Sequence, residues 1–256
     1  MADLQLRRMG RRAVQGDPDA IAHEIIMRVR TGALPRNHIV YAAHLGSSIA
    51  KRLEEDPRII VDCANCQARR EERTRRNRSP GPTPIRETPR HCLRCNGAER
   101  VVLDKGLIKF LKQADDVPHR ILVGWSADCV EHQLENLAPR NPMAYQGRYR
   151  LPNQPTQDPT LETVVLPAVR CWLETGRLDP VIYQSASVNS APNRTLGVGT
   201  SLATMVSLSE MPDEGRKVRC RAAEIASTCY HAAGGTRAER TWQEQRLISY
   251  LLGYLG

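Results

Sequence analysis

Apolar side chains recur at three- and four-residue intervals along several stretches of this 256-residue chain, a spacing that predicts amphipathic helices. The first clear stretch starts at Asp17, a helix-capping residue that is followed by Pro18, and it ends at Gly32. Two shorter helices are expected over residues 36–45 and 48–55. These elements predict a helical N-terminal region over residues 1–57. The stripe expected to face inward in the first helix is Ile21, Ile25, Ile26 and Val29.

The same pattern returns at the other end of the chain. One helix is expected to stop at Gly234 and Gly235, and Thr236 with Glu239 has the spacing of a capping box for the last helix. We therefore expect a helical C-terminal domain over residues 159–256. The inward stripes of the two helices would be Val218, Ala222, Ile225, Ala226 and Cys229, and then Trp242, Leu247, Ile248, Leu251 and Leu252.

The middle of the chain is less regular. A helix is expected over residues 107–115, and the run RILVGW at residues 120–125 has the composition of a buried strand. Ser126 would then cap a helix that buries Val130, Leu134 and Leu137. Residues 105–138 are thus predicted to be a small α/β or helical segment.

Prolines in a polar stretch predict a linker over residues 139–158 and a domain boundary there. A helix should follow from Asp158 to Thr175, with a kink at Pro167. Residues 181–208 are rich in Ser, Thr, Asn, Gly and Val, which indicates either two short strands or an irregular loop.

Composition agrees with a mainly α fold. The chain has a single Phe and 4% aromatic residues, so its core must consist of small aliphatic side chains, which favour helix packing. No apolar run approaches the roughly 20 residues that a membrane span requires, and the first residues lack the apolar segment of a secretory signal. We expect a cytoplasmic protein without membrane association, in which the eight cysteines stay reduced.

Four of those cysteines form two Cys-x-x-Cys pairs, Cys63 with Cys66 and Cys92 with Cys95. A two-residue gap lets both thiolates of a tight turn reach one Zn²⁺ ion at about 2.3 Å, and two such turns complete a tetrahedral site. Four thiolates leave no position for a reactive water, so the zinc is predicted to be structural.

Short apolar runs at residues 59–61 and 101–103 flank the two cysteine pairs and predict strands. The order of strand, knuckle, insert, knuckle and strand resembles the zinc ribbon, and the resemblance covers residues 58–104. In the second knuckle Asn96 and Gly97 suit the turn that brings backbone amides to the thiolates. The first knuckle departs from the family pattern, because Gln67 and Ala68 stand where a Gly is usual. The overall prediction is therefore mainly helical with an inserted small β zinc ribbon.

The segment between the two cysteine pairs is strongly basic. Residues 67–90 hold eight arginines and three glutamates, a net charge of +5 out of +9 for the whole chain. They contain no aromatic side chain on which a base could stack, so binding there should involve the phosphate backbone and tolerate sequence changes. The alternative interpretation is a solvated loop in an arginine-rich protein. The residues expected to contact nucleic acid are Arg69, Arg70, Arg73, Arg75, Arg76 and Arg78.

Two further resemblances suggest a different function. Residues 39–53 resemble the helix-turn-helix of a single ankyrin-type repeat through Ala42, Ala43, Gly46, Ile49 and Leu53, although one copy cannot form a solenoid. The alanine-rich C-terminal hairpin is similar to the closing helices of various bacterial all-helical proteins, toxin-immunity proteins among them. This likeness implies an all-helical protein-interaction module with a purely structural zinc site as the alternative function.

Catalytic signatures are missing from the sequence. Neither a glycine-rich dinucleotide motif nor a P-loop lysine is present, and the Ser residues lie in no nucleophile elbow. Cys129 with His132, and Cys229 with His231, could supply a second metal site, but such side chains more often fill cores or surfaces. The sequence favours a non-enzymatic binding protein whose partner is nucleic acid or another protein.

Overall fold

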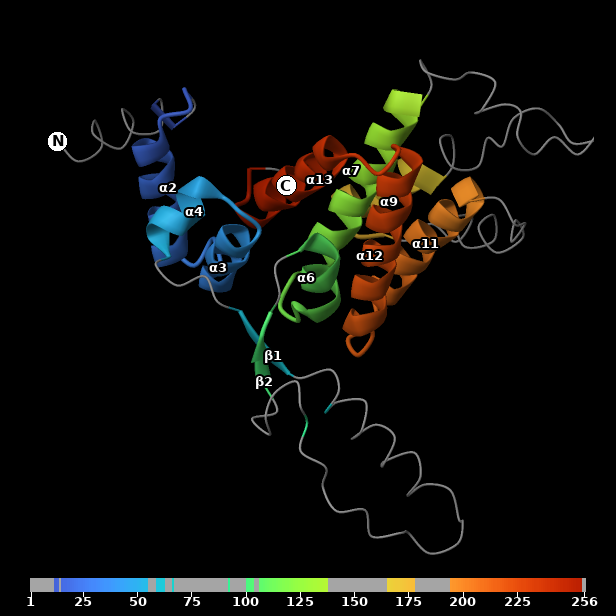
Figure 1. Cartoon of the computed structure of the whole chain (residues 1–256), viewed down its shortest axis with the longest axis horizontal. Coiled ribbons are helices and arrows are strands. Elements are labelled where there is room, and N and C mark those ends of the chain that lie inside the picture. The colour runs from blue at the N-terminus through green and yellow to red at the C-terminus, as the bar shows by residue number, and fades with distance from the viewer. Residues whose placement is uncertain are drawn as a thin grey trace, which may run out of the picture.

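Nine helices and two short strands make up the regular structure of the described residues (Figure 1). The computed structural model describes residues 12–13, 15–54, 59–62, 66, 92, 100–103, 106–137, 165–177 and 194–254. The mainly α prediction is confirmed. None of the helices in these ranges combines the length and the apolarity that crossing a bilayer requires.

Three short helices form the N-terminal end: α2 (Pro18–Arg30), α3 (Arg36–His44) and α4 (Ser48–Leu53). Asp17 caps α2 as predicted, since its carboxylate accepts the backbone N–H groups of Asp19 and Ala20. Gly46 has φ +111° between α3 and α4, a conformation that side chains with a Cβ rarely adopt. The predicted inward stripe is correct for Ile25, which is fully buried, and wrong for Ile26, which is 36% exposed.

The remaining helices form the larger body of the molecule: α6 (Leu107–Gln113), α7 (His119–Leu137), α9 (Leu166–Thr175), α11 (Arg194–Ser209), α12 (Gly215–Ala232) and α13 (Arg237–Leu251). They share one hydrophobic core, built around the fully buried Trp125, Phe110, Leu202 and Leu247. Helices on both sides of residues 139–158 contribute to this core. Figure 1 shows α13 between the three N-terminal helices and the rest of the body.

Strands β1 (Ile60–Asp62) and β2 (Arg100–Val102) pair in antiparallel fashion, with Val61 opposite Val101. They lie where the sequence predicts strands. At their base Ile59 and Leu103 are buried in the main core, and the Leu103 N–H donates to the Ile59 carbonyl at 2.7 Å. Figure 1 shows this two-stranded stem extending away from the helices.

Two predictions in the middle of the chain are wrong. Residues 120–125 are the beginning of the continuous helix α7, not a strand. Every residue from Leu122 to Val130 is buried, so the apolar run reflects a helix surrounded by others. Residues 194–209 are helix α11, where a strand pair or loop was expected. Pro167 lies in the first turn of α9, where a missing N–H costs nothing. Residues 158–164 of the helix predicted over residues 158–175 lie outside the described residues, so the kink stays a prediction.

The predicted helices near the C-terminus are confirmed. Val218, Ala222, Ile225, Ala226 and Cys229 of α12 are all buried. In α13 the Thr236 hydroxyl accepts the Glu239 N–H at 3.2 Å, as expected of a cap. The α12–α13 hairpin therefore closes the body.

Candidate functional site

The β1–β2 stem fixes where the two cysteine pairs leave the helical body. The strands are antiparallel with Asp62 opposite Arg100, and the first pair begins at residue 63, directly after β1. The second pair ends at residue 95, and four residues, 96–99, separate it from β2. Because antiparallel strands place the exit of one beside the entry of the other, the chain leaves β1 and re-enters β2 at the same end of the stem.

Of the four predicted zinc ligands, the structure describes two. Cys92 is buried, with 4% of its surface exposed, and Cys66 is half-buried. Cys63 and Cys95 lie outside the described residues, as do the six arginines at positions 69, 70, 73, 75, 76 and 78. Cysteine sulfur is a ligand type that zinc favours, and the four-cysteine site stays a prediction. Among the described residues alone, no group of three His, Cys, Asp or Glu side chains could hold a metal.

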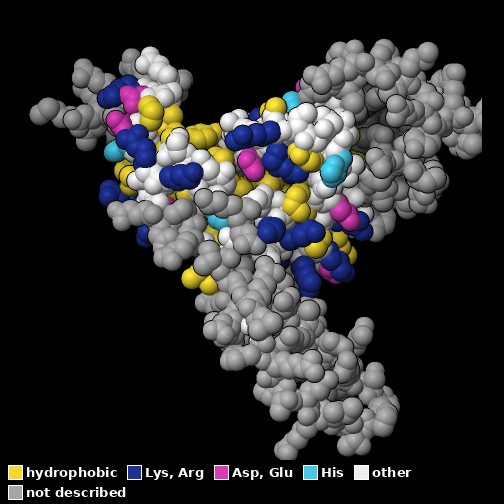
Figure 2. Space-filling model, viewed as in Figure 1, with side chains coloured by type: hydrophobic (Ala, Val, Ile, Leu, Met, Phe, Trp, Pro, Cys, Tyr) yellow, Lys and Arg dark blue, Asp and Glu magenta, His cyan; other side chains and the backbone are white. Residues whose placement is uncertain are grey.

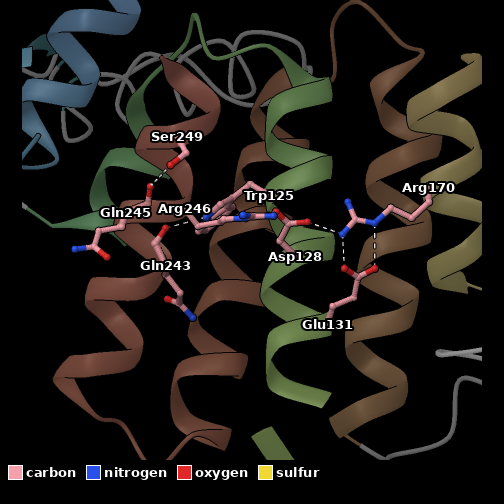
Figure 3. Close-up of polar contacts among 8 residues, drawn as sticks. All are labelled: Trp125, Asp128, Glu131, Arg170, Gln243, Gln245, Arg246 and Ser249. Atoms are coloured by element: carbon pink, nitrogen blue, oxygen red, sulfur yellow. Dashed lines mark hydrogen bonds and ion pairs between the residues drawn. The ribbon is translucent and has the colours of Figure 1, made fainter. Parts of the chain in front are cut away.

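A cluster of charged side chains joins α7 to α9 and α13 (Figure 3). The Asp128 carboxylate, only 5% exposed, accepts a hydrogen bond from Arg170 Nη2 and another from Arg246 Nε, each at 2.5 Å. Arg170 also donates to both carboxylate oxygens of Glu131. Two acids and two arginines thus neutralise one another, and Asp128 ties the two flanking helices to α7.

Tyr250 packs beside this cluster. A Cβ added at Gly124 would lie 3.2 Å from the Tyr250 hydroxyl oxygen, so the missing side chain makes room for the ring. Burial, reinforced by the negative charge of Asp128, raises the pKa of Tyr250 to about 12. The phenol therefore stays neutral at physiological pH.

A second polar cluster surrounds the buried Glu239 at the start of α13. Its carboxylate lies 3.4 Å from His132 Nε2 and accepts a hydrogen bond from the Gln243 side chain at 3.0 Å. The His132 ring stacks on Trp242, with centroids 3.7 Å apart and planes 8° from parallel. Gln243 Nε2 also donates to the Ala226 carbonyl of α12, so this cluster connects α7, α12 and α13.

Two thiols lie in the core near Glu239 but have the properties of packing residues. Cys129 is completely buried and Cys229 is 3% exposed. Burial, with the charge of Glu239 as a smaller cause, raises the pKa of Cys229 to about 12 and that of Cys129 well above its usual value. Both thiols are protonated at neutral pH, the form that is a poor nucleophile and a poor metal ligand.

The end of α13 is held by the N-terminal helices. Arg28 Nη1 donates to the carbonyls of Leu252 and Gly253 at 3.0 and 3.1 Å. His38 Nδ1 lies 3.1 Å from the Leu251 carbonyl. The last turn of a helix leaves its carbonyl acceptors open. A cation and an imidazole from other helices therefore satisfy them here.

Sequence reasoning missed these buried polar groups. Asp128 and Arg170 each interrupt a run of apolar residues, ILVGWSADCV and LPAVRCWL, and a charge inside such a run is the signal that could have identified them. Nothing in the sequence pairs the two, which are 42 positions apart. The chain matches no protein-family model, no curated protein and no solved structure.

Proposed function

We propose that residues 58–104 form a four-cysteine zinc ribbon that presents the arginine-rich insert to the phosphate backbone of a nucleic acid. The protein would then be a binding protein, and the zinc would serve only to hold the ribbon. The observation that carries this proposal is the antiparallel stem, which is rooted in the core by Ile59 and Leu103. The chain between its two strands contains both Cys-x-x-Cys pairs, so it leaves and re-enters the stem at one end.

The distribution of charge supports the insert as the basic element. The described residues contain 20 Lys and Arg and 17 Asp and Glu, a net charge of +3 against +9 for the whole chain. Figure 2 shows Lys and Arg side chains dispersed among apolar and acidic ones over the visible face of the helical body. The insert, with +5 in 24 residues, carries more than half of the net charge of the whole chain. A phosphate backbone attracts such a segment through the release of its counterions.

A salt titration of binding to generic duplex DNA and to RNA tests the function. We expect binding at about 50 mM salt, with an affinity that falls linearly on a double-logarithmic plot. Each arginine that contacts a phosphate of duplex DNA should contribute about 0.9 to the slope. The idea is abandoned if nothing binds at low salt, or if the affinity does not depend on salt.

Two variants that lose the same number of positive charges distinguish binding by the insert from binding by the overall charge of the chain. Replacing the six arginines at positions 69, 70, 73, 75, 76 and 78 by Gln should abolish most of the binding. The matched control replaces six exposed basic residues elsewhere in the described part of the chain and should retain the binding. An equal loss in both variants would show that only net charge matters. The control positions are Arg30, Lys51, Lys112, Arg120, Arg177 and Arg237.

The zinc site is tested separately by metal analysis of the purified chain. We expect one zinc per chain, lost after Cys63→Ser or Cys95→Ser. Zinc removal should leave the helical signal nearly unchanged, because the core of the body is apolar. A chain that binds no zinc under reducing conditions would refute the ribbon, whatever its affinity for nucleic acid. A chain that binds zinc but no nucleic acid would instead favour the protein-interaction module.

A further inference from the structure

Helices α2 to α4, here called the N-terminal helical unit, have a hydrophobic cluster of their own. Ile25, Leu34, Ile39, Ala42, Ala43 and Ala50 form it together with Leu252 from the end of α13. The neighbouring Leu251 belongs to the main core. The unit is thus attached to the body at the last residues of α13 and, at the end of α3, through Tyr41 and Leu45, which belong to the main core. There the rings of Tyr41 and His44 both contact Phe110.

His38 is the buried polar group at that attachment, with 3% of its surface exposed. A carbonyl oxygen only accepts hydrogen bonds, so the bond to Leu251 requires that His38 Nδ1 carry the proton. In the neutral ring Nε2 then has no hydrogen, and this atom is buried without a hydrogen-bond partner among the described residues. Neutral imidazole fits the site, and imidazolium would place an N–H where none of these residues accepts it.

We propose that the attachment of the N-terminal helical unit to α13 is a pH-sensitive contact, which opens when His38 is protonated. The physical reason is the cost of burying an N–H donor and a charge without a partner. Opening lets the imidazolium reach water. It also exposes the apolar faces of Ile25, Ile39 and Leu252, so the open form presents a new hydrophobic surface.

Charges around His38 offset only part of the cost of protonating it in the closed form. The carboxylate of Asp116 favours imidazolium, and so does the Leu251 carbonyl at the negative end of α13. Burial outweighs both and lowers the pKa of His38 below 6.5. Arg28 from α2 caps the adjacent carbonyls and adds a positive charge at the same helix end. The other charged side chains on the packed elements α4, α6 and α13 are Lys51, Arg52, Lys109, Lys112, Arg237, Glu239, Arg240, Glu244 and Arg246.

The sign of the pH dependence follows from the lowered pKa. Well above pH 6.5 both the closed and the open form hold a neutral His38, and the contact is at full strength. As pH falls below 6.5 the open form gains the proton first, so opening becomes easier until the pH reaches the pKa of the closed form. The opening constant should rise by up to about tenfold for each pH unit in that window.

Amide hydrogen exchange on the full chain reports this opening, because helices of 13 and 9 residues are marginally stable once they lose their packing partners. We compare protection factors, corrected for intrinsic exchange, at about pH 7.5 and about pH 5.5. Amides of α2 and α3 should lose up to about tenfold protection at the lower pH, while those of α7 and α12 keep theirs. His38→Asn retains an N–H donor for the Leu251 carbonyl but cannot be protonated, so it should remove the pH response. His23→Asn, at an exposed position of α2, is the matched control and should respond like the unmodified chain.

Two results would overturn the proposal. One is a response in which α2 and α3 lose no more protection than α7, or in which His38→Asn responds like the unmodified chain. The other is an NMR titration of the unmodified chain that gives His38 a pKa of 6.5 or higher. That second measurement needs no variant, so it decides the question even if His38→Asn fails to fold.

Discussion

Replacing Asp128 by Asn tests whether the buried charge cluster holds the helical body together. Asn has nearly the same size as Asp and keeps one oxygen acceptor, so the change removes the charge without creating a cavity. Asp128 accepts hydrogen bonds from Arg170 on α9 and Arg246 on α13. In the variant Arg246 loses the carboxylate with which it pairs, whereas Arg170 keeps Glu131.

The loss of unfolding free energy expected for Asp128→Asn lies between two known limits. Breaking a fully buried ion pair costs about 3–5 kcal/mol, and an exposed pair contributes at most about 1 kcal/mol. Asp128 is 5% exposed, while the side chains of Arg170 and Arg246 are 31% and 37% exposed and can regain water. We therefore expect the free energy of unfolding to fall by about 2–3 kcal/mol, toward the buried limit but below it.

Urea unfolding followed by far-UV circular dichroism measures this change. The slope of the unfolding free energy against urea concentration should stay the same. Asp213→Asn at an exposed position is the control and should stay within about 0.5 kcal/mol of the unmodified chain. A double-mutant cycle with Arg246→Met should give a coupling energy of about 1–2 kcal/mol. If Asp128→Asn costs no more than the control, or the coupling is zero, the cluster does not stabilise the body.

Two close contacts give further predictions. Gly124→Ala should lower the melting temperature, because the new Cβ would lie 3.2 Å from the Tyr250 ring. In a helix without this contact, Ala would stabilise the interior by about 1 kcal/mol relative to Gly. A higher melting temperature would show that the ring moves aside easily. Arg28→Ala removes the donor to the Leu252 and Gly253 carbonyls and should destabilise the N-terminal helical unit by about 1–2 kcal/mol. Hydrogen exchange should find that loss in α2 and α3, and an equal loss in α7 would contradict it.

Helices with a clear start and a solvent-facing side could be predicted from the sequence. Asp17 and Pro18 mark the start of α2, and Thr236 with Glu239 marks that of α13, through contacts within the first turn. Such signals are local, so they persist whatever the rest of the chain does. The cysteine spacing is local as well, which is why the candidate zinc ligands can be named from the order of residues alone.

Helix α7 shows why the rest could not be predicted. Predicting a helix from the spacing of its apolar residues requires a polar side as well. Helix α7 has almost none over residues 122–130, because other helices surround it. The same packing explains α11, whose Ser, Gly and Val residues would not favour a helix alone. The partners of Asp128 and His38 were hidden for a related reason. They come from helices far away in the sequence, and only the packed structure brings them together.

Helix α13 connects the larger helical body to the N-terminal helical unit. Its apolar face reaches the main core through Leu247 and Leu251, and the residue that follows it, Leu252, reaches the N-terminal cluster. Apolar contacts are non-directional, so they resist a shift of one helical turn, about 5.4 Å, less strictly than directed bonds do. Hydrogen bonds do not tolerate such a shift. The Trp125 indole N–H donates to the Gln243 carbonyl at 2.9 Å, and Asp128 holds Arg246 one turn later. These bonds fix the position of α13 along its axis, and with it the place where the N-terminal helical unit attaches.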